Sequence, residues 1–591
     1  MQPLKTPSAP SPAAANDVGE PRPTVSEASR RAFLTTLAGT TLVGLMAPKL
    51  RADGGTGGEL VSTEAMAAAE KLMDLELTDA ERQLARQGLE EMRQQYGLLR
   101  TVSVPNAVPP ALVFQPVPPT GQTPAAALSQ AQPPQSSPAT ELPTADDDLA
   151  FASLPELASW LASRQLSSVE LTRKVLARLE RLGPVLECVV HRTAERALAE
   201  AEQADQALAR GEAGPLTGIP WGAKDLLSAR GYPTTWGAKP FVDQRIEEDA
   251  TVVTRLAAAG APLAAKLTLG ALAWGDVWFG GTTRNPWNLE QGSSGSSAGS
   301  ASASAAGLVP FTIGSETWGS IVSPCTRCGA SGLRPTFGRV SRHGAMALSW
   351  SMDKLGPIAR SVEDCALVFE AIQGVDARDP STVAADLPPW RSIEPRKLRV
   401  GYVATAFDEE REDGEWADFD RQTLETLEGL GFELRPITLP ELPVSALSFI
   451  LSAEAATAFD ELTRDGRDDE LVRQVEQAWP NVFRQARYIP AVEYLQANRV
   501  RTMLMQQMAE LFEGIDAYVC PSYGGDNLLL TNLTGHPSVV MPNGFRQDGT
   551  PTSITLVGRN FGDAEVLALG HAYQQATDFH RKRPTLNPEA T

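Results

Sequence analysis

The chain has 591 residues, of which 72 are acidic and 52 are basic, so its net charge is 52 − 72 = −20. This length exceeds one ordinary domain and allows a large core with appendages. Because an acidic surface repels phosphate backbones and no basic run offsets it, we expect no nucleic-acid partner.

The first 52 residues resemble an export signal. Residues 1–28 are rich in Pro, Ala and Ser, and we expect them to be disordered. Arg30 and Arg31 precede an apolar run, 32–47, that is shorter than the about 20 residues of a membrane span. This pattern is typical of a twin-arginine signal, although a chance basic pair before a short helix has it too. We therefore expect export by the Tat machinery to the periplasm or the extracellular space, with the segment kept as an anchor if it is not cleaved.

Two helices and a linker are expected next. One helix covers about 63–77, and a second begins at Thr78, where Thr78 and Glu81 have capping-box spacing. These two helices predict a small helical appendage over 53–113, which either packs against the core as a clasp or covers the entrance to its functional site. A Pro/Gln/Ser-rich linker follows over 114–148.

A larger α/β region is expected over 149–580, followed by a short tail, 581–591. Ser167 and Glu170 mark one helix start, and the acidic run 408–420 predicts a solvated helix face. Apolar strand-like runs alternate with helical stretches, which predicts a layered α/β fold with a largely buried sheet. These runs are 262–267, 308–314, 398–405, 516–522, 537–542 and 553–558.

The cysteines indicate neither a disulfide framework nor a metal site. The chain has only five cysteines in 591 residues, and an odd, sparse set does not form a disulfide framework. Cys325 and Cys328 form a C-x-x-C motif with no second pair and no nearby histidine, which favours two packed thiols or an occasional disulfide over zinc. No metal, nucleotide or flavin motif is present, so we expect no cofactor.

The segment Gly292–Pro324 concentrates serines and glycines in two clusters, 293–300 and 315–323, separated by an apolar run. Glycine lets a backbone approach a ligand closely, and a serine hydroxyl can attack or relay a proton. We therefore expect the two clusters to converge on one catalytic site.

Three motifs compete for the catalytic role. Ser297 fits the G-x-S-x-G nucleophile elbow, but that motif must follow a strand and the preceding residues predict a loop. Ser351 and Lys354 fit S-x-x-K without its companion motifs. Lys224, in GIPWGAKDLL, is enclosed by apolar and glycine residues. Burial can lower a lysine pKa enough to make it a base, whereas a lysine with only its stem on the sheet stays charged.

Four motifs together resemble the amidase signature family, in its order: GIPWGAKDLL, GSSGSSAGSA, GSETWGSIVSP and GLRPTFGRVS. The resemblance extends from about 150 to 578 and implies an α/β/α layered fold with a central mixed sheet. It also implies a triad of Lys224 as base, Ser296 as a bridging serine after a cis peptide bond, and Ser320 as nucleophile. The family places these serines 24 residues apart, and 320 − 296 = 24.

The resemblance implies hydrolysis of a carboxylic amide to an acid and an amine or ammonia, through an acyl-enzyme on Ser320. It puts the oxyanion hole on the backbone N–H groups of Thr317, Trp318, Gly319 and Ser320. Many members have glycine at the position of Trp318, so the sequence leaves open which of these N–H groups form the oxyanion hole. Trp318 and Trp278 predict a pocket for bulky apolar or aryl amides, with core filling as the alternative.

Two other functions stay open. One is the glutaminase subunit of a transamidation complex that supplies ammonia to charged tRNA. The export signal and the net charge of −20 argue against this function. The other is a non-catalytic exported binding protein with this fold, against which the three filled triad positions weigh. The sequence leaves the substrate and the oligomeric state open, a homodimer being one option.

Overall fold

The computed structural model describes residues 61–73, 75–104, 108, 110–112, 141–409 and 414–586. The predicted export signal, residues 114–140 of the predicted linker and the end of the predicted tail lie outside these residues. None of the described helices is both long enough and apolar enough to cross a membrane.

A single mixed sheet of 11 strands organises the molecule. β2 runs parallel to β3 and β8, and β11 runs parallel to β12 and β13, whereas the other pairings are antiparallel. In sheet order the strands are β1 (Val189–Arg192), β3 (Leu263–Leu267), β2 (Trp221–Lys224), β8 (Phe311–Glu316), β10 (Lys354–Ala359), β9 (Ser331–Arg334), β14 (Ser538–Phe545), β15 (Pro551–Gly558), β13 (Ala517–Pro521), β11 (Val400–Val403) and β12 (Leu434–Ile437). Two small hairpins pair β4 (Val277–Trp278) with β5 (Gly281–Thr282) and β6 (Arg284–Asn285) with β7 (Asn288–Gly292).

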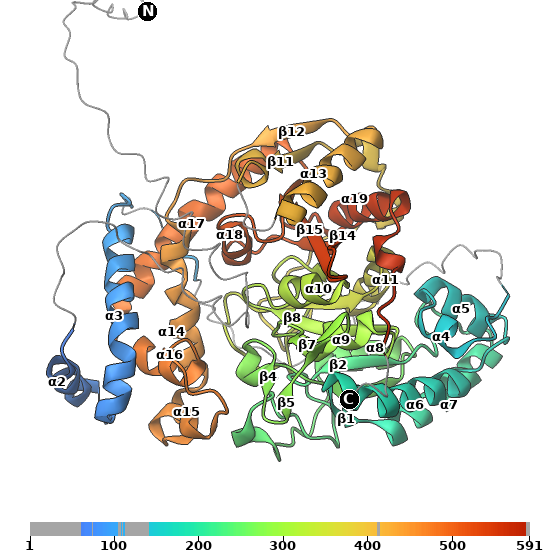
Figure 1. Ribbon diagram of the computed structural model, residues 1–591, viewed down its shortest axis with the longest axis horizontal. Coiled ribbons are helices and arrows are strands. Elements are labelled where there is room, and N and C mark those ends of the chain that lie inside the picture. The colour runs from blue at the N-terminus through green and yellow to red at the C-terminus, as the bar shows by residue number, and fades with distance from the viewer. Residues whose placement is uncertain are drawn as a thin grey trace, which may run out of the picture.

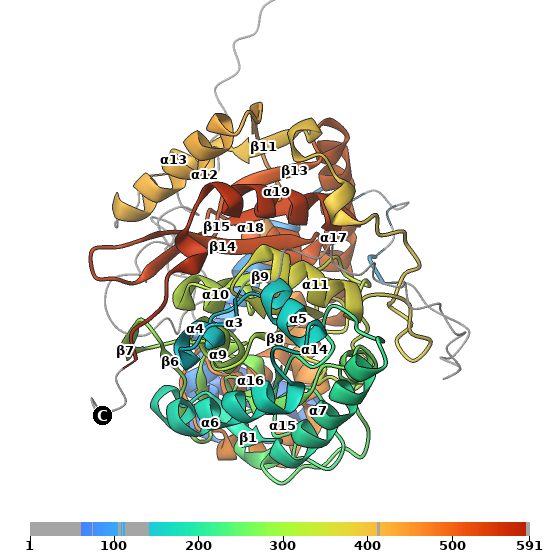
Figure 2. The same ribbon diagram turned by 90° about the vertical axis from the view of Figure 1, so that its right-hand side faces the viewer.

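Helices cover the sheet and extend beyond it (Figure 1). They are α2 (Thr63–Met73), α3 (Asp79–Leu99), α4 (Asp146–Ala150), α5 (Leu154–Ala162), α6 (Ser168–Leu186), α7 (Ala194–Ala209), α8 (Thr251–Ala258), α9 (Ala298–Ala305), α10 (Val322–Cys328), α11 (Val362–Ile372), α12 (Ala404–Phe407), α13 (Gly414–Gly429), α14 (Phe449–Ala458), α15 (Asp460–Arg464), α16 (Trp479–Ala486), α17 (Ala491–Gly514), α18 (Asn527–Leu533) and α19 (Asp563–Ala576). Figure 2 shows α10 and α11 on either side of β9. The predicted α/β fold, with a central mixed sheet flanked by helices, is confirmed.

Local sequence signals mark several helix starts as predicted. Thr78 and Glu81 form a complete capping box at α3, and Ser167 and Glu170 form one at α6. In each case the N-cap hydroxyl accepts a backbone N–H of the first turn, and the glutamate accepts the N-cap N–H. All five cysteines are buried free thiols.

Two predictions near the centre of the sheet are wrong in detail. The strand predicted over 308–314 is β8, Phe311–Glu316, which begins after Pro310 and continues through two polar residues. Proline has no N–H for the ladder, whereas Ser315 and Glu316 pair with β10 and are buried. The loop predicted before Ser297 contains the short strand β7, whose hairpin with β6 supplies hydrogen bonds that the sequence pattern does not reveal.

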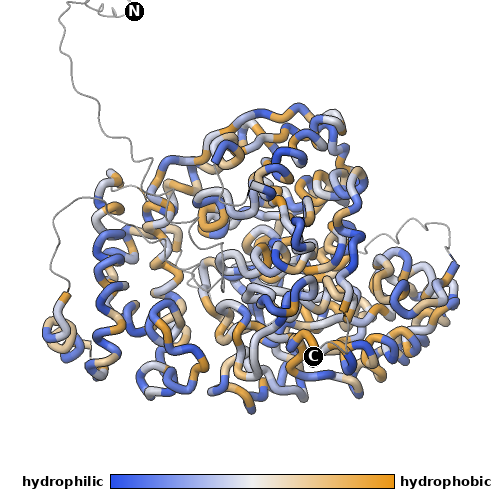
Figure 3. Tube along the Cα trace, viewed as in Figure 1, coloured by the Kyte–Doolittle hydropathy of each residue, from blue (hydrophilic) through white to orange (hydrophobic). Residues whose placement is uncertain are grey.

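The N-terminal helices pack on a helical layer that lies beside the sheet. Figure 1 shows α3 next to α14, α16 and α17, on the side of the molecule opposite α6 and α7. In Figure 3 α3 is mostly hydrophilic, with hydrophobic positions spaced along it. Those positions form its buried face: Ala85, Leu89, Met92, Tyr96 and Leu99. The helices α2 and α3 are thus anchored on the helices that follow residue 448 in the chain.

Candidate active site

Lys224 is the last residue of β2, a strand whose four residues are all buried. Because β2 runs parallel to β8 with Ala223 opposite Ile313, Lys224 lies beside the last residues of β8, which include Ser315. Strand pairing therefore brings Lys224 to a residue 91 positions away in the sequence.

Three serine hydroxyls surround the amino group of Lys224. Its Nζ lies 2.9 Å from Ser296 Oγ, 3.0 Å from Ser297 Oγ and 2.9 Å from Ser315 Oγ. Burial lowers the pKa of Lys224 well below its ordinary value of 10.5, although the charges of Asp353 and Glu316 oppose this shift. A lowered pKa favours the neutral amine, which has a lone pair and can accept a proton.

Ser296 reaches Lys224 from a loop that passes close to a second loop. The Gly295–Ser296 peptide bond is cis, as the family resemblance implies. A Cβ atom at residue 295 would lie 1.8 Å from the carbonyl oxygen of Gly275, so the approach of the two backbones requires glycine there. The Ser297 N–H donates to the carbonyl of Ser320 at 3.1 Å. The bridging serine and the predicted nucleophile are therefore on adjacent backbone segments.

Ser320 lies in a turn between β8 and α10 that Glu316 closes. Glu316 Oε2 accepts the backbone N–H groups of Ile321 and Val322 at 2.8 and 2.9 Å. Arg334 Nη1 donates to the other carboxylate oxygen at 2.6 Å. Burial alone would raise the pKa of Glu316, but the Arg334 charge and these hydrogen bonds outweigh it and lower the pKa to about 2. The carboxylate stays ionised and fixes the backbone of the turn.

The same turn presents free backbone donors. Gly319 has φ of +86°, a conformation that favours glycine. Within the described part of the chain, the N–H groups of residues 317–320 donate to no acceptor. Thr317 Oγ1 donates to Asp353 Oδ1 at 2.5 Å, which ties the turn to the residue before β10. A row of fixed, unpaired N–H groups beside a hydroxyl is suited to binding an oxyanion.

A cavity of about 310 Å³ extends from Ser315 and Thr317 to Trp350. Its volume is within the range of small-molecule sites. Its apolar wall is formed by Leu226, Ala273, Met346, Ala347, Leu348 and Leu355.

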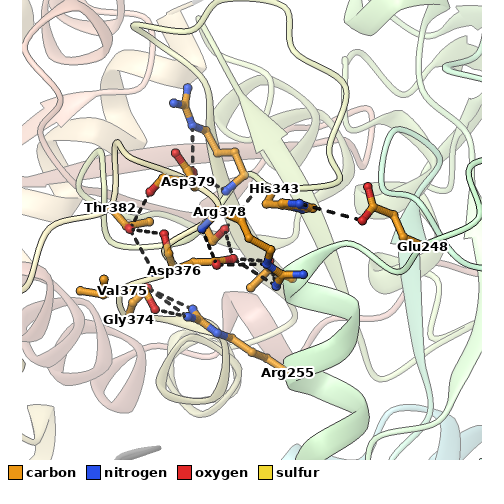
Figure 4. A network of polar contacts seen from close by, with 12 residues as sticks. Glu248, Arg255, His343, Gly374, Val375, Asp376, Arg378, Asp379 and Thr382 are labelled. Atoms are coloured by element: carbon orange, nitrogen blue, oxygen red, sulfur yellow. Dashed lines mark hydrogen bonds and ion pairs between the residues drawn. The ribbon is translucent and has the colours of Figure 1, made fainter. Parts of the chain in front are cut away.

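Several charged residues at this cavity pair with charged side chains of the protein (Figure 4). Arg378 Nε lies 3.2 Å from Asp376 Oδ1, and Arg342 Nε lies 3.5 Å from Asp379 Oδ2. His343 Nε2 faces Glu248 Oε2 at 3.9 Å. Both arginines are thus already bound to carboxylates of the protein.

The two tryptophans predicted for the pocket lie elsewhere than this cavity. Trp318 is partly buried and packs against both hydrophobic clusters of the core. Trp278 packs edge-on against Phe279, with ring centroids 4.8 Å apart. Neither lines the cavity, whereas Trp350 does. A pocket role for Trp318 and Trp278 therefore stays a prediction from the sequence.

Curated relatives resemble this chain over most of their own length. A glutamyl-tRNA(Gln) amidotransferase subunit from Methylococcus capsulatus is 35% identical over 480 residues, covering 73% of this chain and 98% of that protein. The subunit of the same name from Chloroflexus aggregans is 36% identical over 473 residues, covering 72% and 96%.

Solved structures of amidases have the same fold. An amidase family protein from Bacillus anthracis superposes with a TM-score of 0.66 at 25% identity, covering 75% of this chain and 94% of that one. A peptide amidase from Stenotrophomonas maltophilia superposes with a TM-score of 0.63 at 27% identity, covering 73% and 98%. A family model named Amidase matches residues 170–529. With the lysine, the cis peptide bond and the serine turn arranged as described, the chain belongs to the amidase signature family.

Proposed function

We propose that the protein hydrolyses a carboxylic amide through an acyl-enzyme on Ser320, with Lys224 as the base and Ser296 as the proton relay. The backbone N–H groups of Thr317, Trp318, Gly319 and Ser320 stabilise the oxyanion of the tetrahedral intermediate. The contact of a buried lysine with Ser296 Oγ, at 2.9 Å, carries this proposal. The chemistry needs only groups of the protein and water, so no cofactor takes part.

The hydrogen bonds around Lys224 support this direction of proton transfer. Ser297 Oγ donates to the carbonyl of Ser315 at 3.0 Å and accepts its N–H at 3.1 Å, so its proton is committed. Lys224 must therefore donate to Ser297. A neutral amine has two N–H bonds and one lone pair, and in this proposal Ser315 Oγ accepts the second N–H. The lone pair is left for the hydroxyl of Ser296.

The reaction then proceeds in two halves. Ser296 takes the proton of the Ser320 hydroxyl and passes its own to Lys224, while Ser320 Oγ attacks the carbonyl carbon of the substrate. The proton returns by the same relay to the leaving nitrogen, which departs as ammonia or an amine. Water then attacks the acyl-enzyme with the same base and releases the acid.

A fluorophosphonate tests the nucleophile, because it reacts covalently with an activated serine. We expect one adduct, mapped by peptide mass to Ser320, and none in the variants Ser320→Ala and Lys224→Ala. Ser304→Ala is the matched control, since this serine of α9 has a buried hydroxyl without a hydrogen bond. An adduct on Ser297, or hydrolysis of amides and esters that survives both substitutions, would contradict the triad. A wild-type protein that is inert in both assays would favour a non-catalytic binding function.

A second candidate is a glutaminase subunit of an amidotransferase, which the named relatives at 35–36% identity favour. The pairing of Arg342 and Arg378 with carboxylates weighs against it, because glutamine brings an α-carboxylate that needs a cation. Glutaminase activity that appears only with a copurifying subunit would support this candidate. Hydrolysis of simple amides by the isolated chain would oppose it.

We also propose export through the twin-arginine pathway, which the residues Ser29, Arg30 and Arg31 before an apolar run support. Replacing both arginines by lysine is expected to retain the protein in the cytoplasm. Fractionation of cells that carry the wild-type or the double-lysine chain measures this, and equal distribution of the two would contradict it.

A further inference from the structure

The loop that carries Trp350, residues 348–351, is held by hydrogen bonds from both of its sides. Asp353 Oδ2 accepts the backbone N–H groups of Leu348 and Ser349 at 2.8 and 2.9 Å. Arg342 Nη1 donates to the carbonyl of Trp350 at 2.8 Å. These contacts fix the backbone on the side of the cavity.

The helical layer fixes the other side of the same loop. Glu454 of α14 accepts the hydroxyls of Ser349 and Ser351, both at 2.6 Å. Arg501 of α17 donates to the hydroxyl and the carbonyl of Ser351, both at 2.7 Å. Glu454 and Arg501 are each only 5% exposed. Two buried charged side chains therefore hold one short loop in a single position.

The side chain on this rigid loop is nevertheless left open. Trp350 is 50% exposed, and it is the only aromatic residue among the strongly exposed large hydrophobic side chains of the described chain. It lines the same cavity as Ser315 and Thr317. A rigidly held, exposed indole beside a site is suited to binding, because it offers a large apolar face at a small cost in conformational entropy.

We propose that Trp350 is a binding platform for an uncharged aryl group of the amide substrate, which stacks on the indole while the amide lies at the Ser315 and Thr317 end. The inference rests on the proposed function, whose substrate class it specifies. The apolar wall that includes Met346 and Leu355 favours an apolar group over a polar one. In Figure 4 the guanidinium of Arg378 is turned toward Asp376 of the protein, and this pairing favours an uncharged group over an anionic one.

The test compares substrates with and without an aromatic ring in the wild type, Trp350→Ala and Trp350→Phe. Acetanilide has its ring on the leaving amine, benzamide has it on the acyl group, and acetamide has none. For Trp350→Ala we expect kcat/KM to fall about tenfold for at least one aryl amide and to change less than twofold for acetamide. Trp350→Phe should retain most of the activity on that aryl amide. The aryl amide that is affected shows which side of the scissile bond faces the indole.

The substitutions leave the loop in place, because Arg342 binds the backbone of Trp350 and not its side chain. Leu495→Ala, on α17, is the matched control, since Leu495 is similarly exposed, at 47%, and does not line the cavity. It should leave all three substrates unaffected. Equal losses for aryl amides and acetamide in Trp350→Ala, or no loss for either aryl amide, would overturn the inference.

Binding separates this inference from the catalytic proposal. Acetanilide and benzamide are titrated into the single variant Ser320→Ala and into the double variant that also carries Trp350→Ala. This binding measurement needs no turnover. We expect the Kd of the aryl amide to rise about tenfold in the double variant. Unchanged binding would reject the platform even if the wild type hydrolyses amides. Weakened binding would support the platform even if Ser320 does not react with a fluorophosphonate.

Discussion

Lys224 and Lys266 lie on the neighbouring strands β2 and β3, and neither side chain is accessible to solvent. Lys266 pairs with Ala223 across the strands, so Lys224, the next residue, points to the opposite face of the sheet. Lys266 Nζ lies 2.7 Å from Asp225 Oδ1 and 3.0 Å from Thr234 Oγ1. Lys224 has three hydroxyls around it and, among the described residues, no carboxylate within ion-pair distance.

The difference shows that the partner, more than burial, decides what a buried lysine can do. Burial lowers the pKa of both side chains. For Lys266, the charge of the adjacent Asp225 and the hydrogen bond to it raise the pKa again and offset part of this shift. The pKa of Lys224 stays well below its ordinary value, because the carboxylates that oppose the shift act from a distance. A hydroxyl can accept a proton from the lysine or give one to it, whereas a carboxylate keeps the lysine charged. One lysine is therefore suited to catalysis and the other to holding the fold.

The largest expected effect is on activity, in Lys224→Met, which keeps the length of the side chain and removes the base. We expect kcat/KM for a hydrolysed amide to fall by about 10²–10⁴-fold, the usual contribution of general acid–base catalysis. Steady-state kinetics measures this, and circular dichroism checks that the fold is retained. Activity within tenfold of the wild type would contradict the assignment of Lys224 as the base.

The matched change on the neighbouring strand, Lys266→Met, should affect stability instead. It leaves the buried carboxylate of Asp225 without its ion-pair partner, which costs about 3–5 kcal/mol in comparable sites. Denaturant unfolding measures this loss, while kcat per folded molecule should stay near that of the wild type. The comparison fails if Lys266→Met is as stable as the wild type, or if it loses activity without losing stability.

The pH dependence of stability should reveal the lowered pKa of Lys224. The lowered pKa of Lys224 means that, between that value and 10.5, the unfolded chain binds a proton that the folded chain does not. Stability attributable to Lys224 therefore increases as the pH rises through this window, by up to about 1.4 kcal/mol per pH unit. Denaturant unfolding of the wild type and Lys224→Met over a pH series should show this slope as their difference. Lys354 is also buried with a lowered pKa, but it is present in both proteins, so its contribution to the pH dependence cancels in the difference.

Short-range patterns in the sequence predict part of this site. The capping residues of α3 and α6 predict where those helices begin, and the motifs around Lys224, Ser296 and Ser320 are each recognisable locally, whereas their grouping into one site is implied by the family resemblance. Such signals lie within a few residues of one another, so a single sequence reveals them.

The rest of the site depends on contacts between distant segments. Ser315 meets Lys224 only because β8 pairs with β2. The position of Trp350 depends on its neighbour Ser351, whose carbonyl accepts from Arg501, 150 residues beyond Ser351 in the chain. Neither contact follows from periodicity or composition, because strand pairing and helix packing are set by the whole fold. The pocket tryptophans predicted from the sequence, Trp318 and Trp278, accordingly differ from the one that lines the cavity.

The smallest expected effect separates two roles for Ser297, the nucleophile of the competing G-x-S-x-G interpretation or a support for the base. Its hydroxyl accepts one N–H of Lys224 at 3.0 Å and is held by the backbone of Ser315. If Ser297 only orients the amine, Ser297→Ala should lower kcat about tenfold with KM unchanged, because the lysine lone pair is less often directed at Ser296. A fluorophosphonate should then still label Ser320, more slowly by a similar factor, whereas Ser304→Ala should label at the wild-type rate. Loss of all labelling in Ser297→Ala, with the fold retained, would instead indicate that Ser297 is the nucleophile. Lys224 would then be a residue next to the nucleophile and not the base of a triad with Ser320.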